Sequence, residues 1–291
     1  TIKRLIIQAV GTIGARDPYK LRRKLTYIME SADTSNVDVS IKPWSDAHAS
    51  KNIYEILHFY EIKNGLDEFY SGVCIDNLLK ILADPSLSAY HSLVVQTIQN
   101  ICIYLGIRCF QYLSQIFPSY MHVVRISSPD MQKIILEQLG KLVSLAKAKT
   151  RPYIHELFTL LVDVWIDSQH IGLQSTIVKV IEYLVCSIPD DASCYIPFII
   201  PKISKILLSD RKDVDISTEY NQLATLLLSS IQRMGPYLKD HIFLIIPAVI
   251  KGFDRSSKPI PLQKLAMNTI QTLFLCNDLN DFVSPIIQAI I

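Results

Sequence analysis

Glycine is scarce in this sequence, with 9 residues among 291. So low a number argues against a turn-rich β fold and against an enzyme built on a glycine-rich nucleotide loop. Long apolar runs are also missing. One of the longest, IFLIIPAVI at residues 242–250, has about half of the ~20 residues that a membrane span needs. The sequence therefore predicts no membrane span.

Charge of one sign is not in excess, because 29 basic and 27 acidic residues leave a formal net charge of +2. Proteins that bind nucleic acid or an anionic membrane typically have a marked excess of basic residues, and this sequence has none overall. The six cysteines include no C-x-x-C pair, and most of them lie within apolar runs. We therefore expect reduced, buried thiols, as is typical of a cytosolic protein.

Hydrophobic residues make up 49% of the chain and recur with a regular period. An aromatic or related residue followed by aliphatic residues begins each unit, and successive anchor residues are 43, 41, 42, 46 and 41 positions apart. Two-helix repeats of the HEAT and armadillo type have periods of about 40–47 residues. The anchor residues are Phe69, Tyr112, Tyr153, Tyr195, His241 and Phe282.

Each unit has the same internal order. The anchor precedes an amphipathic helix, a polar corner follows, and a second amphipathic helix completes the unit. Corners such as RISSPD, at residues 125–130, contain Ser, Asp and Pro, which favour helix N-termini through side-chain caps and a preset first turn. After this corner the spacing predicts a helix over residues 130–147, with Leu139 on its apolar face. No sustained two-residue alternation predicts a strand.

The sequence thus predicts an all-α fold, an α-solenoid of about six to seven HEAT-type helix pairs forming a single segment over residues 1–291. One helix pair cannot bury both of its apolar faces, so each pair must stack on the next. Residues 30–52 are rich in Ser, Asp and Asn, and we expect a polar, mobile insertion there. The chain lacks an initial Met and ends within an apolar helical pattern. We therefore expect a fragment of a much longer chain.

Gly11 and Gly14 form a G-x-x-G pair that resembles a phosphate-binding loop only superficially. Strand signals do not flank it, as they would in a KH domain, and the spacing is wrong for a Walker loop. We expect instead that Gly14 ends a helix over residues 2–13 in a left-handed turn and that Pro18 prevents its continuation.

A basic run follows this corner at Lys20, Arg22, Arg23 and Lys24. Its two interpretations are a solvated helix face and a docking site for an acidic partner segment, and no second basic block supports binding of nucleic acid. Trp44 lies in the polar insertion, either tethering it or serving as an exposed anchor for a protein partner. These five residues are the candidate protein-docking site.

Patterns that support catalysis or metal binding are missing. The seven histidines form no H-E-x-x-H or H-x-x-x-H pair, and the sequence has no two Glu-x-x-His motifs on facing helices, which a di-iron site needs. No serine lies in a strand–turn–helix context. Trp165 has the spacing of a packed core residue. We predict no catalytic, cofactor-binding or metal-binding residues in this segment, and hence a binding or scaffold function.

Several stretches resemble the HEAT-repeat region of target-of-rapamycin (TOR) kinases. They include GTIGARDPYK at 11–20, LDEFYSGVCIDNLLKILADPSLSAYHSLVVQTI at 66–98 and QLGKLVSLAKAKTRPYI at 138–154. The resemblance covers about residues 11–184; beyond that it is limited to the repeat period. The basic run and the insertion depart from the family pattern.

This resemblance implies a parent Ser/Thr protein kinase of the phosphatidylinositol-3-kinase-related class, which binds ATP and Mg²⁺ in a distant C-terminal kinase domain. It implies that this segment supports complex assembly for nutrient and growth signalling, through a second copy of the kinase and raptor-type or rictor-type subunits. The implied location is the cytoplasm, or an endomembrane surface reached through the parent complex. Two alternatives are an importin-type transport receptor, which usually has acidic inner helices, and a phosphatase scaffold subunit, which has more regular repeats.

Overall fold

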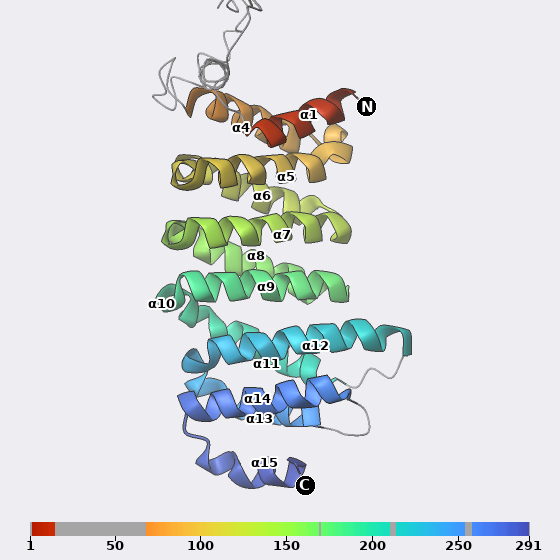
Figure 1. The fold of residues 1–291 in the computed structure, drawn as a ribbon, viewed down its shortest axis with the longest axis vertical. Coiled ribbons are helices and arrows are strands. Elements are labelled where there is room, and N and C mark those ends of the chain that lie inside the picture. Colours follow the sequence, from red (N-terminus) through yellow and green to blue (C-terminus); the bar gives the residue numbers. More distant parts are fainter. Residues whose placement is uncertain (1, 15–67, 169, 210–213, 254–257, 291) are drawn as a thin grey trace, which may run out of the picture. The chain divides into compact units, whose positions relative to one another are not determined.

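The computed structural model describes residues 2–14, 68–168, 170–209, 214–253 and 258–290 (Figure 1). Within these ranges the regular structure is helical, with no strand. The chain divides into two compact units, Thr1–Ser119 and Tyr120–Ile291. Both consist of packed helices, so the predicted all-α class is confirmed.

In the first unit, α5 packs against both α1 and α4. The predicted helix over residues 2–13 is α1. A close approach joins it to α5, because a Cβ atom added at Gly11 would lie 3.1 Å from the Thr97 hydroxyl oxygen. That hydroxyl donates to the Ile7 carbonyl at 3.2 Å. The elements are α1 (Ile2–Ile13), α4 (Glu68–Ala83), η2 (Pro85–Leu87), α5 (Ser88–Leu105), η3 (Gly106–Tyr112) and the start of α6 (Leu113–Ile126).

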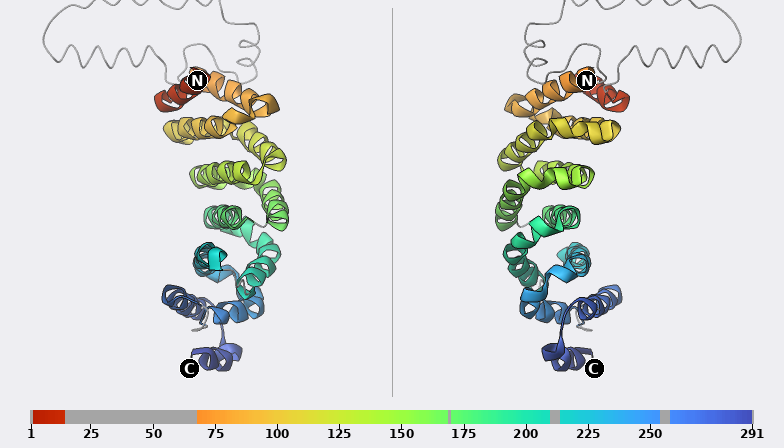
Figure 2. Two further views of the ribbon diagram at one scale, coloured as in Figure 1. Left: turned by 90° about the vertical axis from the view of Figure 1, so that its right-hand side faces the viewer. Right: turned by 90° about the vertical axis from the view of Figure 1, so that its left-hand side faces the viewer.

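In the second unit, the helices form two layers (Figure 2). In the first layer α7, α9, α12 and α14 pack each against the next, and in the second layer α11 packs against α13. Each pair therefore covers a face of its neighbour, which confirms the α-solenoid arrangement within this unit. The first layer contains α7 (Pro129–Ala146), α9 (Ile171–Ser187), α12 (Val214–Met234) and α14 (Ile260–Cys276). The second contains α8 (Ile154–Asp167), α11 (Ile196–Leu208), α13 (Ile242–Ile250) and α15 (Val283–Ile290).

The anchor residues have a shared structural role. From the second anchor onward, each anchor is the last residue of a 3-10 turn, and the α-helix of the second layer, or α6, begins at the next residue. The turns are η3, η4 (Lys147–Tyr153), η5 (Ser193–Tyr195), η7 (Lys239–His241) and η9 (Asn280–Phe282). The period read from the sequence therefore marks the recurrence of this turn.

The prediction that corner residues cap the helices is correct at one corner and wrong at others. The Asp84 carboxylate accepts a hydrogen bond from the Ser86 amide at 2.9 Å. The residues before α7, α9 and α14 are Ser128, His170 and Pro259, and none makes a side-chain cap. At α7 and α14 a proline lies in the first turn and presets its geometry instead.

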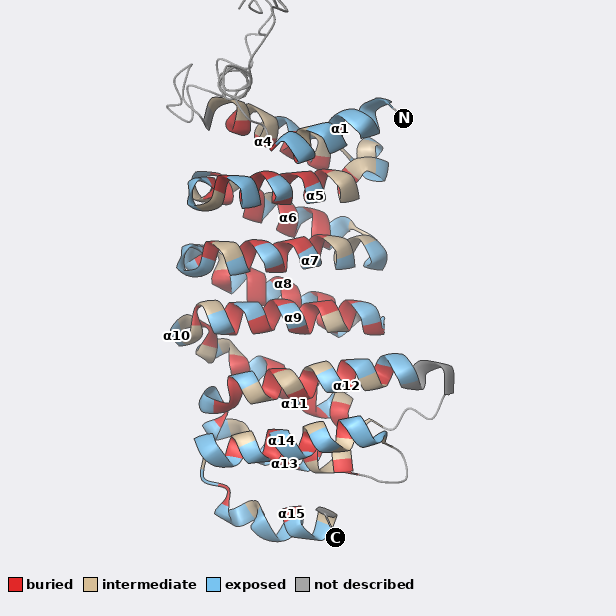
Figure 3. Ribbon diagram, viewed as in Figure 1, coloured by how far each residue is buried: buried red, intermediate tan, exposed pale blue. Residues whose placement is uncertain are grey.

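The apolar core follows the helix faces that the sequence predicted (Figure 3). Leu139 is fully buried in α7, and Trp165 is 2% exposed in α8. The thiol prediction was wrong in part: Cys102 and Cys109 are buried, but Cys186, Cys194 and Cys276 are exposed. An apolar run on an amphipathic helix still has a side that faces away from the stack.

Gly14 follows α1 with a φ of 72°, and its amide donates to the Val10 carbonyl at 3.0 Å. The predicted left-handed helix end is therefore confirmed. Positive φ values recur six residues before two anchors, at Gly106 (57°) and at Lys147 (48°). Lys147 thus holds a backbone conformation that L-amino acids rarely adopt.

Among the described residues, one helical run, Pro85–Ile126, is long and apolar enough to cross a membrane by length and composition. It consists of η2, α5, η3 and α6, and the backbone turns at Gly106. Half of its most apolar window is buried inside the protein. Those features fit packed core helices.

Candidate protein-interaction surface

The second-layer helices and α6 present equivalent positions to the outside. Because each anchor from Tyr112 onward ends a 3-10 turn, residues two, three and six positions after it fall on corresponding sites. All of them are exposed except Gln115, which is half-buried. The sites are Ser114, Gln115 and Pro118 in α6; His155, Glu156 and Thr159 in α8; Pro197, Phe198 and Pro201 in α11; Phe243, Leu244 and Pro247 in α13; and Ser284, Pro285 and Gln288 in α15.

The chemistry of these positions changes along the chain. In α8 all three residues are polar, whereas in α11 and α13 all six are apolar. Phe198 is 68% exposed and Phe243 is 69% exposed. We call the six apolar residues of α11 and α13 the α11/α13 surface. The Phe243 ring also meets the Phe282 ring edge to face, with centroids 5.1 Å apart.

Direct bonds hold α11 and α13 together beneath this surface. The Ser204 hydroxyl donates to the Leu244 carbonyl at 2.8 Å. The Lys251 amine donates to the Leu208 carbonyl at the C-terminal end of α11. The exposed apolar side chains therefore project from two helices with a fixed mutual position.

The N-terminal end of α8 and the turn before it contact residues of the following repeat. The Arg151 guanidinium pairs with the Asp191 carboxylate at 2.6 Å. Tyr195 stacks on Phe158, with ring centroids 4.5 Å apart, and its hydroxyl lies 3.1 Å from His155 Nδ1. Desolvation raises the pKa of Tyr195, so its phenol stays neutral near pH 7. These contacts connect α8 with the repeat that follows it.

A buried polar cluster joins α9 to α12. Glu182 is 8% exposed, and its carboxylate accepts from the Ser230 hydroxyl at 2.9 Å. Its other oxygen accepts from the Arg233 guanidinium. The charge and both oxygens of Glu182 are thereby satisfied, as a buried carboxylate requires. The cluster stabilises the seam between the helices and lies apart from the α11/α13 surface.

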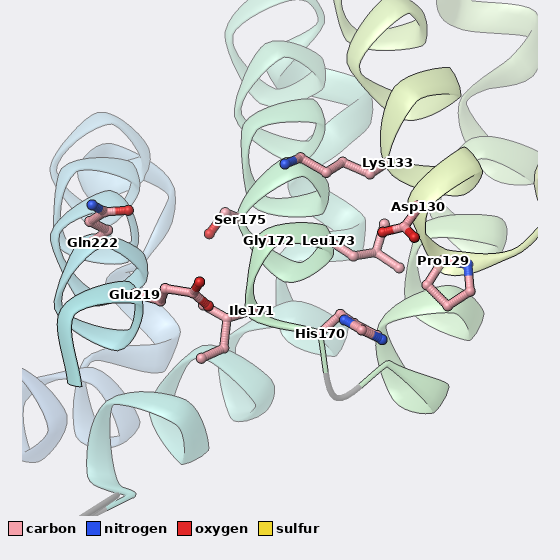
Figure 4. Close-up of a pocket in the computed structure, with 10 residues that line it drawn as sticks. All are labelled: Pro129, Asp130, Lys133, His170, Ile171, Gly172, Leu173, Ser175, Glu219 and Gln222. Carbon is pink, nitrogen blue, oxygen red and sulfur yellow. The ribbon is translucent and has the colours of Figure 1, made fainter. Parts of the chain in front are cut away.

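A pocket of about 340 Å³ lies near the N-terminal ends of α7, α9 and α12 (Figure 4). The side chain of Lys133 extends over Gly172, where an added Cβ would lie 3.6 Å from the lysine nitrogen. Its wall contains two carboxylates, one lysine and one histidine, and this mixture of charges does not single out one class of ligand. The pocket is lined by Pro129, Asp130, Lys133, His170, Ile171, Gly172, Leu173, Ser175, Glu219 and Gln222.

The described ranges contain no group of three His, Cys, Asp or Glu residues that could hold a metal ion. The predicted docking residues Lys20, Arg22, Arg23, Lys24 and Trp44 all lie in residues 15–67, outside the described part of the chain. The insertion predicted at residues 30–52 lies there too. Their roles stay predictions.

Sequence reasoning missed the α11/α13 surface. The signal was present, because aligning the units on their anchors places Phe198 and Leu244 at the same position as Glu156. The repeat pattern was treated as the same in every repeat, although these positions are polar in α8 and apolar in α11 and α13.

Comparison with known proteins identifies a family model and several relatives. Residues 1–147 match the family model described as serine/threonine-protein kinase mTOR domain. The chain is 30% identical over 293 residues to serine/threonine-protein kinase mTor of Drosophila melanogaster and 30% identical over 290 residues to serine/threonine-protein kinase TOR2 of Saccharomyces cerevisiae. Each alignment covers 100% of this chain and 11% of the relative.

A plant relative extends the comparison. Serine/threonine-protein kinase TOR of Arabidopsis thaliana is 25% identical over 294 residues, which cover 98% of this chain and 11% of the relative. The chain thus spans about one ninth of the length of the curated relatives that it matches. With half of its residues matched by the family model, this chain belongs to the mTOR family of serine/threonine-protein kinases.

Proposed function

We propose that this chain is a protein-interaction scaffold segment of a TOR-type serine/threonine kinase. The observation that carries the proposal is the α11/α13 surface, where a stack of helix pairs presents large apolar side chains that stay more than two thirds exposed, Phe198 and Phe243. Exposed aromatic residues of this kind are typical of protein-binding surfaces. The parent kinase catalyses phosphate transfer in a kinase domain outside this segment, and that domain binds ATP and Mg²⁺.

The partners that we propose are a raptor-type or rictor-type subunit and a second copy of the kinase. A series of stacked helix pairs offers extended surfaces to such partners, because each unit adds outward positions to the next. The balanced formal charge of +2 argues against nucleic acid as the partner. The proposed location is the cytoplasm, or an endomembrane surface reached through the complex, and the proposed role is in growth signalling.

The test uses the full-length kinase carrying Leu139→Asp, which disrupts the buried seam of α7. We expect loss of the co-purifying raptor-type or rictor-type subunit, or of the second copy, with retained phosphorylation of a short generic peptide. The matched control is Ser144→Asp, because Ser144 is exposed on the same helix. Full retention of all partners by the Leu139→Asp kinase would contradict the proposal.

A further inference from the structure

We propose that the α11/α13 surface binds an amphipathic helix of a partner protein, and that this helix carries acidic residues at the end that lies over Lys205 and Lys251. This inference deepens the proposed scaffold function and rests on it, since the partner is taken to be another subunit of the kinase complex.

The apolar character of this surface is not a requirement of the fold. The corresponding positions in α8 are His155, Glu156 and Thr159, and α8 packs in the same layer with polar residues there. Phe198 and Phe243 keep more than two thirds of their side-chain surface in water. An aromatic side chain buries about 150–250 Å² when covered, so two of them, with Leu244 and the prolines, approach the few hundred Å² typical of a binding patch.

The two ends of the surface differ in net charge. Lys205 and Lys251 each lie ten residues after an anchor, near the C-terminal ends of α11 and α13. In the turns before α13 and α15, Asp240 and Asp281 are exposed, and Lys239 is exposed beside Asp240, which leaves one net negative charge there. A ligand that is acidic at the lysine end and free of carboxylates at the other end is complementary to this pattern.

A helix fits this surface better than a membrane does. Two adjacent helices, fixed to each other by the Ser204–Leu244 bond, present two rows of apolar side chains, as in complexes where an amphipathic helix lies along neighbouring helices. Attraction to anionic lipid usually needs a cluster of about four to eight basic residues. Here two lysines lie at one end, and the other end has Lys239 beside two carboxylates, so these charges do not form such a basic cluster.

The experiment places the photo-crosslinking residue p-benzoylphenylalanine at Phe198 or at Phe243 in the full-length kinase expressed in cells. Adducts are identified by mass spectrometry. We expect peptides from another subunit of the complex, with apolar residues at helical spacing and at least two carboxylates at one end. The same substitution at Glu156, the corresponding site in α8, is the control and should give no such adduct.

Charge reversal tests the proposed orientation. Adding Lys205→Glu to the Phe198 crosslinking variant should lower the adduct yield about fivefold, which corresponds to ~1 kcal/mol of lost complementarity. An unchanged yield would overturn the acidic-end assignment. Because the altered residues are exposed, the helices should keep their fold, and the Phe243 variant provides an independent second position.

Four results would overturn the inference: an adduct with a second copy of the kinase, an adduct with lipid alone, a basic or extended peptide, or no adduct above the Glu156 control. The same samples are assayed for complex assembly. An assembled complex without the expected adduct overturns this inference and leaves the proposed function standing. A kinase that assembles with no subunit overturns both.

Discussion

Leu139→Asp tests most sharply whether the helix pairs depend on shared buried faces. Leu139 is fully buried in α7, the helix that packs against α9. The substitution removes an aliphatic side chain from this seam and introduces a carboxyl group. No described contact of Leu139 with a basic side chain offers the new group a partner.

The magnitude follows from three contributions. Losing the buried Leu side chain costs about 2 kcal/mol. An unpaired carboxylate in this position would become protonated rather than stay charged, and neutralising an aspartate of ordinary pKa at pH 7 costs about 4 kcal/mol. Burying the neutral carboxyl without full hydrogen bonding adds about 1 kcal/mol or more. The sum is about 7 kcal/mol, and in a stack with nearest-neighbour coupling it falls on α7 and the helices beside it.

The sign of the pH dependence provides a second check. Burial raises the pKa of the introduced carboxyl above its unfolded value, so the folded state of the variant binds a proton more readily than the unfolded state. Lowering the pH from 7 to 5 should therefore recover about 2.7 kcal/mol of the loss. Urea unfolding of the purified chain, followed by circular dichroism at both pH values, measures this. A loss below about 1 kcal/mol, or one that does not depend on pH, would refute the burial of this face.

Three further predictions concern other parts of the molecule. Lys147→Gly relieves the positive φ of 48° and should raise the free energy of unfolding by about 1 kcal/mol; a decrease in urea titration would contradict the strained turn. Ser230→Ala removes a donor to buried Glu182 and should cost about 1–2 kcal/mol, whereas Thr225→Ala, at an exposed site on the same helix, should cost less than about 0.5 kcal/mol. The purified 291-residue chain with Mg-ATP should transfer no phosphate to a generic peptide in a radiolabel assay, and clear transfer would contradict a purely structural role for this segment.

The sequence predicted the repeat architecture well because the feature that sets the period is local. An anchor such as Tyr153 or Tyr195 ends a 3-10 turn and precedes a helix, so its position marks a helix start. The apolar face of α7 was also predictable, since Leu139 lies at helical spacing from its apolar neighbours. Helical periodicity of this kind is visible in one sequence.

Features that depend on neighbouring units could not be predicted in the same way. Cys186 lies in an apolar run of α9, yet it is exposed because the adjacent helices cover other sides of that turn. Glu182, in the same helix, is buried because Ser230 and Arg233 of α12 meet it. Those partners are about 50 positions away in the chain, and no local pattern indicates that they pair.

Hydrogen–deuterium exchange of the purified chain carrying Leu139→Asp tests the central claim, that each helix pair is stabilised by the pairs beside it. In a stack with nearest-neighbour coupling, we expect exchange to accelerate most in α7 and α9, less in α12, and to stay unchanged in α14. The Ser144→Asp chain should match the unsubstituted one. Acceleration confined to α7, or equal acceleration in all four helices, would contradict the account.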